Sequence, residues 1–304
     1  MELEVNTTTG LNRTSLPSRI IIYAVICMLC LLCVLPFINI LATSLSEAQA
    51  VQKNPQMLFP QQFTLEAYKY IFQTRVLLNS LLITVFVTVV GTALNLIVTT
   101  AGAYALSKDD VPGQKIMVWV VIIPMLIGAG LIPTYILYNR LGLIDSIWAL
   151  ILSGLVAPFN LILMRNFFWS IPKSLYEAAE IDGGGDFTLL FRVVLPMSKS
   201  VLATIGLFYA VGHWNDYFTG LYFINSNEKW PLQVLLKSIL IDFNMAGMGS
   251  ATGGSGQVDV SKLVLQPENI RAATIIFSIV PILLVYPFLQ KYFVKGVVIG
   301  AIKE

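Results

Sequence analysis

Glu177 to Gly185 reads E-A-A-E-I-D-G-G-G, and this stretch decides how the rest of the chain is interpreted. It is acidic, ends in glycine and lies between two long hydrophobic segments. A helix of this polarity is poorly suited to crossing a bilayer. It is suited to lying at the membrane surface, where it can dock into another protein. The sequence therefore predicts a membrane protein that carries a polar surface helix.

The composition of the whole chain supports the membrane class. Of its 304 residues, 56% are hydrophobic and 12% are charged, whereas about a quarter of the residues in soluble domains are charged. The net charge of +2 and the lack of a basic run give no support to a nucleic-acid partner. The first apolar run is too long for a cleavable signal peptide, so we expect it to remain as an anchor in the lipid bilayer.

Six segments carry the roughly 20 mainly apolar residues that a membrane-spanning helix needs. They lie at about 20–43, 77–106, 116–137, 146–168, 199–224 and 270–292. The third is interrupted by Pro124, by Gly128 to Gly130 and by Pro133, which predicts either a pathway-facing break or a simple packing kink. The expected fold class is all-α, a polytopic membrane protein with six transmembrane helices.

The distribution of lysine and arginine predicts the orientation of the chain. With the N-terminus inside, the inner segments carry more of the basic residues although they are shorter in total. This predicts a cytoplasmic N-terminus over 1–19, a membrane domain over 20–292 and a cytoplasmic tail over 293–304. The acidic stretch then lies in a cytoplasmic loop at 165–199.

That loop carries clear signals for two helices. Ser174 and Glu177 have capping-box spacing just after Pro172, and Gly183 to Gly185 provide a stop. Asp186 is expected to cap the second helix. The apolar stripe of that helix is predicted to comprise Phe187, Leu190, Phe191 and Val194. The acidic character favours a protein partner, whereas helices that bind lipid surfaces are usually rich in lysine and arginine.

Other features give no signal for a metal or a bound cofactor. Cys27, Cys30 and Cys33 lie within the first apolar run, where cysteine is an ordinary packing residue. The glycine-rich run from Gly247 to Gly256 lacks the lysine of a phosphate-binding loop, and we expect it to be an external linker. Thr64 is expected to cap a short helix in the first outer loop.

The stretch from Ile171 to Pro196, I-P-K-S-L-Y-E-A-A-E-I-D-G-G-G-D-F-T-L-L-F-R-V-V-L-P, resembles the E-A-A loop of bacterial ABC importer permeases. The D-G-G form resembles the carbohydrate-uptake branch, related to the smaller maltose permease subunit. Within that branch the chain is most similar to permeases for complex oligosaccharides and for the lipoprotein-named sugar systems of Gram-positive bacteria. Leu141 to Leu143, Trp214-Asn215 and the ending Y-F-V-K-G-V-V-I-G-A-I-K also look familial. One departure is Gly184, where many relatives carry alanine.

This resemblance implies the type I ABC importer permease fold and a transport subunit, not an enzyme. The acidic helix would be a coupling helix that docks into a cytoplasmic ATPase. By position, the coupling residues would be Glu177, Ala178, Ala179, Asp182 and Gly183. The expected partners are two ATPase subunits that bind ATP and Mg, a second homologous permease that completes a heterodimer, and an extracellular or periplasmic sugar-binding protein. The location would be the bacterial inner or plasma membrane, with both termini cytoplasmic.

Residues suited to sugar binding lie mainly at the end of the fifth span. Aromatic faces stack on sugar rings, and amides and carboxylates bind hydroxyls, while polar groups at membrane depth usually face a cavity or a partner. The candidates for the substrate pathway are Trp214, Asn215, Asp216, Tyr217, Tyr135 and Asn160. Consecutive helical residues point about 100° apart, so the four neighbours cannot all face one cavity. We expect His213, the single histidine, to serve as a helix contact.

Three alternatives remain open at the level of sequence. The first is an ABC permease for another class of solute, because the assignment to sugar rests on resemblance. The second is an ion-coupled secondary transporter, which would predict acid pairs within the spans or a repeat of broken helices. The third is a membrane enzyme, which would need a clustered nucleophile, metal set or acid–base pair.

Overall fold

The structure is a computed structural model that describes residues 16–246 and 268–301. Its helices are α1 (Leu16–Ser44), α2 (Ala48–Lys53), α3 (Glu66–Gln73), α4 (Arg75–Ser107), α5 (Gln114–Leu126), α6 (Leu131–Arg140), α7 (Ile147–Leu152), α8 (Pro158–Trp169), α9 (Lys173–Ile181), α10 (Asp186–Thr188), η1 (Leu189–Val194), α11 (Leu195–Met197), α12 (Lys199–Trp214), α13 (Phe218–Phe223), η2 (Asn227–Lys229), α14 (Leu232–Ala246) and α16 (Glu268–Ala301). Within these two ranges no strand forms, and a single bridge joins Ser46 and Phe63. The prediction of an all-α fold is confirmed. The predicted linker at Gly247 to Gly256 lies outside the described residues.

All six predicted spans coincide with helices, but only three of them are continuous. Helical segments at Ser18–Ser44, Arg75–Ser107 and Glu268–Val285 are each long and apolar enough to cross a membrane. Two further pairs of helices pass the same test together, and they are bent by 115° between α5 and α6 and by 83° between Asp186–Met197 and α12. Of these two bends, only the one between α5 and α6 lies within a predicted span, the third. The helix bounds also divide the fourth predicted span between α7 and α8 and the fifth between α12 and α13, and α7 with α8 is not one of the pairs that pass the test.

Local residues account for these interruptions. Gly130, which precedes α6, has a φ of 81° that few other residues tolerate. Pro158 opens α8, where its missing N–H group costs nothing. Asn215 and Asp216 follow α12, and the Asp216 carboxylate accepts a hydrogen bond from the backbone N–H of Thr219 at 3.1 Å. The break in the third span was predicted, and the other two were not.

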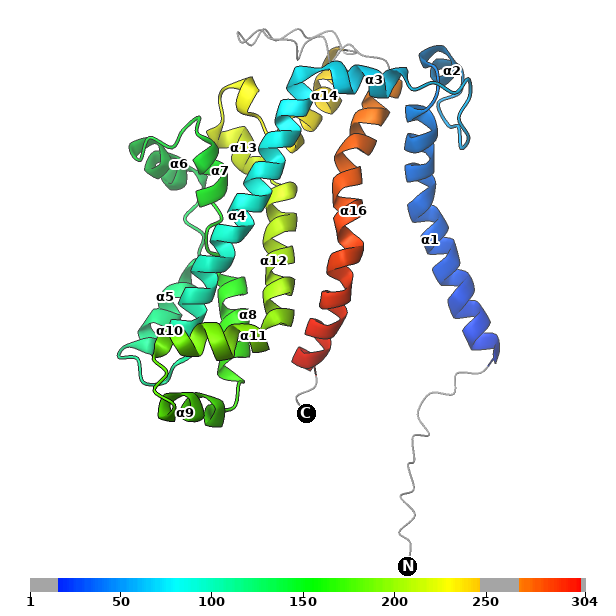
Figure 1. The fold of residues 1–304 in the computed structure, drawn as a ribbon. Helices are drawn as coiled ribbons and strands as arrows, with labels where there is room; N and C mark the ends of the chain where they lie inside the picture. The colour runs from blue at the N-terminus through cyan, green and yellow to red at the C-terminus, as the bar shows by residue number, and fades with distance from the viewer. Residues whose placement is uncertain (1–15, 247–267, 302–304) are drawn as a thin grey trace, which may run out of the picture. The chain divides into compact units, whose positions relative to one another are not determined.

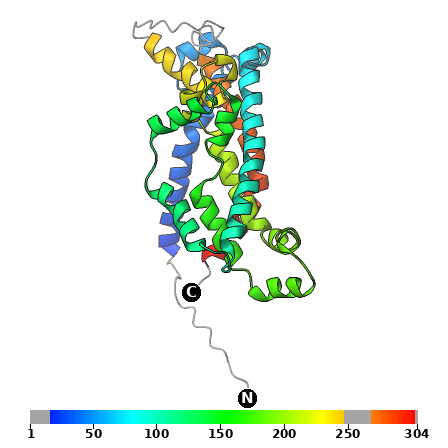
Figure 2. The same ribbon diagram turned by 90° about the vertical axis from the view of Figure 1, so that its left-hand side faces the viewer.

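The chain divides into two compact units, one comprising 1–68 with 267–276 and the other 69–266 with 277–304. In the larger unit α4 packs along both α8 and α12 (Figure 1). One core cluster of this unit includes Ala103, Met164, Phe168 and Ile205, which come from these three helices. Figures 1 and 2 show α9 at one end of this helix group, while α13 and α14 lie at the opposite end.

In the smaller unit the end of α1 is joined to the loop that follows α2. Ser46 is fully buried, and its hydroxyl donates to the carbonyl of Ala42 at 2.7 Å. The side chain of Asn269 donates to the carbonyl of Ser46 at 3.1 Å, which ties the first turn of α16 to this unit. At the start of α3, the hydroxyl of Thr64 accepts the N–H of Glu66 at 3.2 Å, as expected for a cap.

Candidate functional site

The acidic stretch contributes to α9, which begins at Lys173, two residues earlier than the predicted capping box implies. Pro172 occupies the N-cap position with an extended ψ of 131°, and no side chain caps the helix. Ser174 therefore already lies within the first turn, and the predicted capping box of Ser174 and Glu177 is wrong. The fixed φ of proline starts the helix in place of a side-chain hydrogen bond.

The C-terminus of α9 follows the predicted glycine stop. Gly183 has a φ of 80°, and its N–H group donates to the carbonyl of Glu180 at 2.9 Å. The N–H group of Gly184 donates to the carbonyl of Ala179 at 2.8 Å, which completes a Schellman motif. A Cβ atom on Gly184 would lie 2.7 Å from the same carbonyl oxygen. Glycine at this position thus permits a tighter helix end than alanine would.

The predicted apolar stripe after α9 is confirmed at Val194, which is buried, and at Leu190, which packs against the core cluster, but it is wrong at the two phenylalanines. The segment η1 is a π-helix, and its buried residues are Leu189 and Val194, which are five positions apart. Phe187 and Phe191 are instead 79% and 61% exposed. A π-helix forms its hydrogen bonds between residues i and i+5, so a stripe drawn at the α-helical period rotates away from the core.

The turn between α4 and α5 binds the α9 segment at both of its ends. At the first end, the ammonium group of Lys173 lies 2.8 Å from the carboxylate of Asp109. At the second end, Asp186 forms an ion pair with Lys108. The predicted cap by Asp186 is therefore wrong, because Gly185 is the N-cap and no side chain caps α10. Two consecutive residues of opposite charge thus fix the position of α9 relative to α4.

The electrostatics of the two ion pairs differ because their burial differs. Lys173 and Asp109 are well exposed, so solvent screens their attraction. The side chain of Lys108 is only 19% exposed. Burial by itself would lower the pKa of Lys108, but the hydrogen bond to Asp186 and the nearby Tyr104 raise it overall. Its partner Asp186 is 68% exposed, so solvent reaches one side of this pair as well.

Between these attachments α9 presents an accessible face. No residue of α9 is buried, and among the predicted coupling residues Glu177, Ala178, Asp182 and Gly183 are exposed. Ala179 is half-buried and packs against the core cluster of the larger unit. Ile181 is 86% exposed beside the acidic side chains. This combination of carboxylates, small residues and an exposed apolar side chain suits a protein contact.

The structure separates the four consecutive pathway candidates. Trp214 is buried and packs with Leu232 and Leu236, so it belongs to the core. Asn215 is exposed, and its side-chain amide donates to the carbonyl of Val211 at 3.0 Å. Asp216 and Tyr217 are half-buried in the break between α12 and α13. The break, and not a helix face, brings the polar candidates together.

A cation and further aromatic rings accompany these candidates. The ammonium group of Lys237 lies 4.9 Å from the ring centroid of Tyr217. Tyr135 on α6 is partly exposed and stacks on Phe223 with the ring centroids 6.2 Å apart. Asn160 is buried within α8.

Side chains that were not predicted as functional stabilise the break between α7 and α8. The amide of Asn95 donates to the carbonyl of Gly154 at 2.6 Å. The hydroxyl of Tyr209 accepts the N–H of Ala157 at 3.0 Å and lies 2.7 Å from the hydroxyl of Thr99. Irregular backbone at membrane depth needs such partners because lipid offers none. No sequence pattern predicts these pairs.

His213 belongs to the same group of buried side chains. Its Nε2 atom lies 3.3 Å from the side-chain oxygen of Asn95. A Cβ atom on Gly91 would lie 2.6 Å from that nitrogen, so the glycine makes room for the ring between α4 and α12. The predicted role of His213 as a helix contact agrees with this geometry.

Replacement of Tyr209 by phenylalanine is expected to lower the unfolding free energy by about 1–2 kcal/mol, since it leaves the N–H of Ala157 without its partner. Amide hydrogen exchange should accelerate at Ala157. Tyr222→Phe is the matched control, because Tyr222 is partly exposed on α13. Unchanged exchange at Ala157 in the Tyr209 variant would contradict the role assigned to this hydroxyl.

Comparison with known proteins identifies the family to which this chain belongs. The chain matches the family described as "Binding-protein-dependent transport system inner membrane component" over residues 19–299. The chain belongs to this family. The resemblance seen in its sequence is thereby confirmed.

Individual relatives agree with the family assignment. The chain is 43% identical over 283 residues to the polygalacturonan/rhamnogalacturonan transport system permease protein YtcP of Bacillus subtilis (strain 168), which covers 93% of this chain and 97% of the relative. It is 44% identical over 271 residues to protein LplC of the same organism, covering 89% of each. The crystal structure of a bacterial ABC transporter involved in the import of the acidic polysaccharide alginate matches with a TM-score of 0.81 and 34% identity, covering 93% of this chain and 99% of that one.

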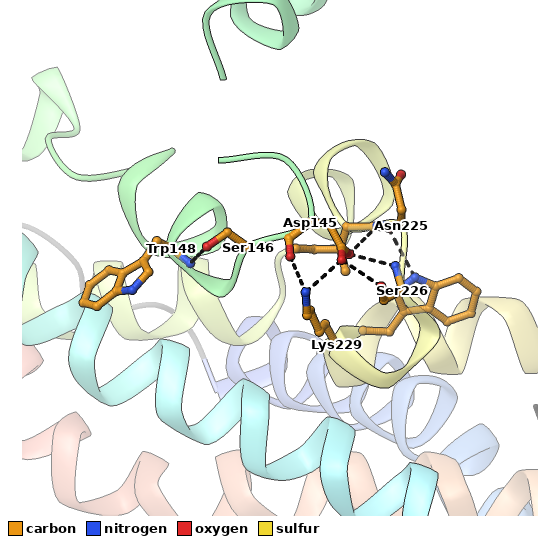
Figure 3. Close-up of polar contacts among 8 residues, drawn as sticks. Asp145, Ser146, Trp148, Asn225, Ser226 and Lys229 are labelled. Atoms are coloured by element: carbon orange, nitrogen blue, oxygen red, sulfur yellow. Dashed lines mark hydrogen bonds and ion pairs between the residues drawn. The ribbon is translucent and has the colours of Figure 1, made fainter. Parts of the chain in front are cut away.

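At the end of the membrane component opposite α9, a second polar cluster surrounds Asp145 (Figure 3). Asp145 has a φ of 60°, and its carboxylate accepts hydrogen bonds from the backbone N–H groups of Asn225 and Ser226 at 3.0 and 2.8 Å. The Ser226 hydroxyl also donates to it at 2.7 Å. Lys229 donates both to this carboxylate at 2.8 Å and to the Asp145 carbonyl at 2.6 Å. The cluster fixes the α6–α7 loop to the α13–η2 loop.

The contacts of Asp145 govern its ionisation. Burial by itself would raise the pKa of its carboxyl, but the bonds from Lys229, Ser226 and Asn225 together hold that pKa well below its usual range. The carboxylate is therefore charged at every physiological pH. No sequence pattern predicts this cluster, because the two members of the ion pair, Asp145 and Lys229, are 84 residues apart in the chain.

Asp145→Asn is expected to lower the unfolding free energy by about 1–2 kcal/mol, since a neutral amide cannot replace a partly screened, charge-assisted acceptor. A depressed folded-state pKa means that the stabilisation is present above the unfolded-state pKa of about 3.9 and is lost as the pH falls further. The difference from wild type should thus stay constant between about pH 5 and 8 and shrink in acid. Asp110→Asn, an exposed position, is the control. A difference that varies across the neutral range would contradict this account.

Proposed function

We propose that this chain is the transmembrane permease subunit of an ATP-driven ABC importer for sugars or oligosaccharides, and that α9 couples it to a cytoplasmic ATPase. The observation that carries the proposal is the geometry of α9, an exposed acidic helix whose first residue, Lys173, and whose following helix, α10, are held by ion pairs to the α4–α5 turn. Motion of a partner against α9 would pass through Lys108 and Asp109 into the long helix α4. Family membership supplies the context for this role.

The proposal includes the subunits that the chain needs. Two ATPase subunits would bind ATP and Mg and would contact Glu177, Ala178, Ala179, Asp182 and Gly183. A second homologous permease would form the other half of the pathway, and an extracellular or periplasmic binding protein would deliver the sugar. Both termini would face the cytoplasm of the bacterium. The names of relatives that are transport-system permease proteins support the role of one subunit within such a system.

Within the sugars, we propose an oligosaccharide that carries carboxylates. The named relatives include a polygalacturonan/rhamnogalacturonan permease and an importer of the acidic polysaccharide alginate. In this chain, the ammonium group of Lys237 over the ring of Tyr217 offers a cation beside an aromatic face. Asn215 and Asp216 lie in the adjacent break and would bind hydroxyl groups.

Two measurements test the proposal in sequence. The chain is first isolated from its native membrane in mild detergent, and the accompanying proteins are identified by mass spectrometry. We expect an ATPase with a Walker motif and a second permease. Recovery of the chain alone, under conditions that preserve known importers, would favour a secondary transporter.

The second measurement is ATPase activity of the recovered complex with its binding protein. Oligogalacturonides are expected to stimulate hydrolysis more than neutral oligosaccharides of equal length. Lys237→Gln should reduce this preference, while Lys53→Gln, on the exposed end of α2, should leave it unchanged. If only neutral sugars stimulate ATP hydrolysis, the proposal of an acidic substrate is overturned. If none of the sugars stimulates it, the transported solute belongs to another class.

A further inference from the structure

The loop from Asn54 to Leu65 carries large apolar side chains that no part of its unit covers. No charged residue occurs in this segment, which reads N-P-Q-M-L-F-P-Q-Q-F-T-L. Phe59 and Phe63 are 80% and 66% exposed, and Leu58 and Leu65 are exposed as well. Large exposed apolar groups of this kind mark contact with a protein or a membrane.

The loop is fixed against the end of α1 by bonds on both of its limbs. On the first limb, the side chain of Asn39 donates to the carbonyls of Pro55 and Met57 at 3.1 and 2.8 Å. The Met57 side chain is buried with Ala42 and Val51. The loop therefore has a defined position beside α1, as Figure 1 shows.

On the second limb, backbone groups pair with the residues just after α1. The N–H of Gln61 donates to the hydroxyl of Ser46 at 3.0 Å. The carbonyl of Gln62 accepts the N–H of Glu47 at 3.2 Å, and Thr64 donates to the carbonyl of Leu45 at 3.0 Å. The tip at 58–60 lies between the two bonded limbs.

The attachment to Asn39 sets the depth of the loop in the membrane. From Ile20 to Ser44 α1 is uncharged, and at 1.5 Å per residue this length is roughly 37 Å, longer than the hydrocarbon core of about 30 Å. Asn39 precedes the end of α1 by five residues, which is about 7 Å along the helix axis. The loop thus returns to the level at which α1 passes from hydrocarbon to head groups.

We infer that the segment Asn54–Leu65 is an interfacial anchor, in which Leu58, Phe59 and Phe63 insert into the lipid beside α1. The neighbouring side chains of α1 at this level, Phe37, Ile38 and Leu41, are exposed apolar groups, so the loop continues the lipid-facing surface of a membrane span. The lack of charge over twelve successive positions from Asn54 to Leu65 favours lipid over a protein surface with a polar rim. Aromatic side chains at this depth are typical of membrane anchors.

The test measures the surroundings of Phe59 directly. Cys27, Cys30 and Cys33 are replaced by alanine, and Phe59→Cys carries a nitroxide label in the protein purified with its accompanying subunits. The sample is reconstituted in vesicles of phosphatidylethanolamine and phosphatidylglycerol. Spin relaxation by oxygen, which concentrates in lipid, is compared with relaxation by a water-soluble nickel chelate. Gln52→Cys on α2 is the exposed control, and Phe63→Cys is a second reporter.

We expect the label at position 59 to show an oxygen-to-nickel accessibility ratio at least several-fold higher than the label at position 52. Nickel accessibility equal to that of position 52 would place the loop in water and overturn the inference. Low accessibility to both reagents would show that a protein partner covers the loop, and this would overturn it as well. The result does not depend on ATP coupling or on the substrate.

Discussion

Sugar uptake is expected to fall by at least about 100-fold when Glu177 is replaced by lysine. The carboxylate of Glu177 is expected to pair with basic groups on the ATPase, so a lysine there would bring like charges together at the interface, at a cost of several kcal/mol. Each 1.4 kcal/mol corresponds to a tenfold change in affinity. Glu177 is exposed in the middle of α9, where its carboxylate interacts electrostatically with Lys173 and is not a member of either ion pair that holds the segment. The variant should therefore insert and fold as the wild type does. Uptake of labelled substrate into vesicles and the amount of protein in the membrane give the two required measurements.

Asp110→Lys is the matched control for this charge reversal. Asp110 is exposed in the α4–α5 turn, at the same end of the larger unit as α9, and the substitution changes the net charge by the same amount. It should leave uptake near the wild-type level, while Glu177→Gln should give an intermediate loss. Equal losses in the Asp110 and Glu177 variants would indicate a general effect of charge, and normal uptake by Glu177→Lys would remove the coupling role from α9.

Gly91→Ala is expected to lower the unfolding free energy by about 1–3 kcal/mol, the usual cost of overpacking a core. The added Cβ atom would lie 2.6 to 2.9 Å from three atoms of the His213 ring, which is itself bound to Asn95. The ring must move, and this disrupts its contact with Asn95. Asn95 in turn donates to the carbonyl of Gly154, between α7 and α8. Thermal unfolding of the detergent-solubilised protein measures the loss.

Replacement of Gly212 by alanine should change the unfolding free energy in the opposite direction. Gly212 lies in α12, and nothing lies within 4 Å of its added Cβ atom, so Gly212→Ala should raise the stability by about 0.5–1 kcal/mol through the reduced freedom of the unfolded chain. His213→Ala should suppress much of the cost of Gly91→Ala in the double variant. Additive effects of these two changes would show that Gly91 does not act through the histidine.

The sequence predicts the continuous helices and the interruption of the third span, because length, hydropathy, proline and glycine are local properties. The interruption of the fourth span was not predicted, because its stabilising partners are distant. Asn95 is 59 residues from Gly154, and Tyr209 is 52 residues from Ala157. No periodicity in the sequence identifies such pairs. The cluster around Asp145 was not predicted either, because its members are also distant in the sequence.

Within the coupling segment, the sequence predicts where α9 ends but not how the chain continues. The stop at Gly183 depends on backbone conformation, which glycine reveals directly. The register after Asp186 depends on the π-helix η1, whose extra residue per turn no composition signal marks. Trp214 was similarly predicted for the pathway from its chemistry, and its packing on Leu232 and Leu236 from α14 could not be foreseen.

The hydrogen bonds at the break between α7 and α8 have a consequence for the order of membrane insertion. Asn95 is synthesised before Gly154, so the hydrogen bond from the Asn95 amide to the Gly154 carbonyl can form as soon as the fourth span emerges. Tyr209 is synthesised 52 residues after Ala157, so the hydrogen bond from the Ala157 N–H to the Tyr209 hydroxyl cannot form until α12 has followed the fourth span into the bilayer. The fourth span thus reaches its final form only after the fifth has been translated, and a nascent chain truncated before Tyr209 would leave the N–H group of Ala157 without that bond.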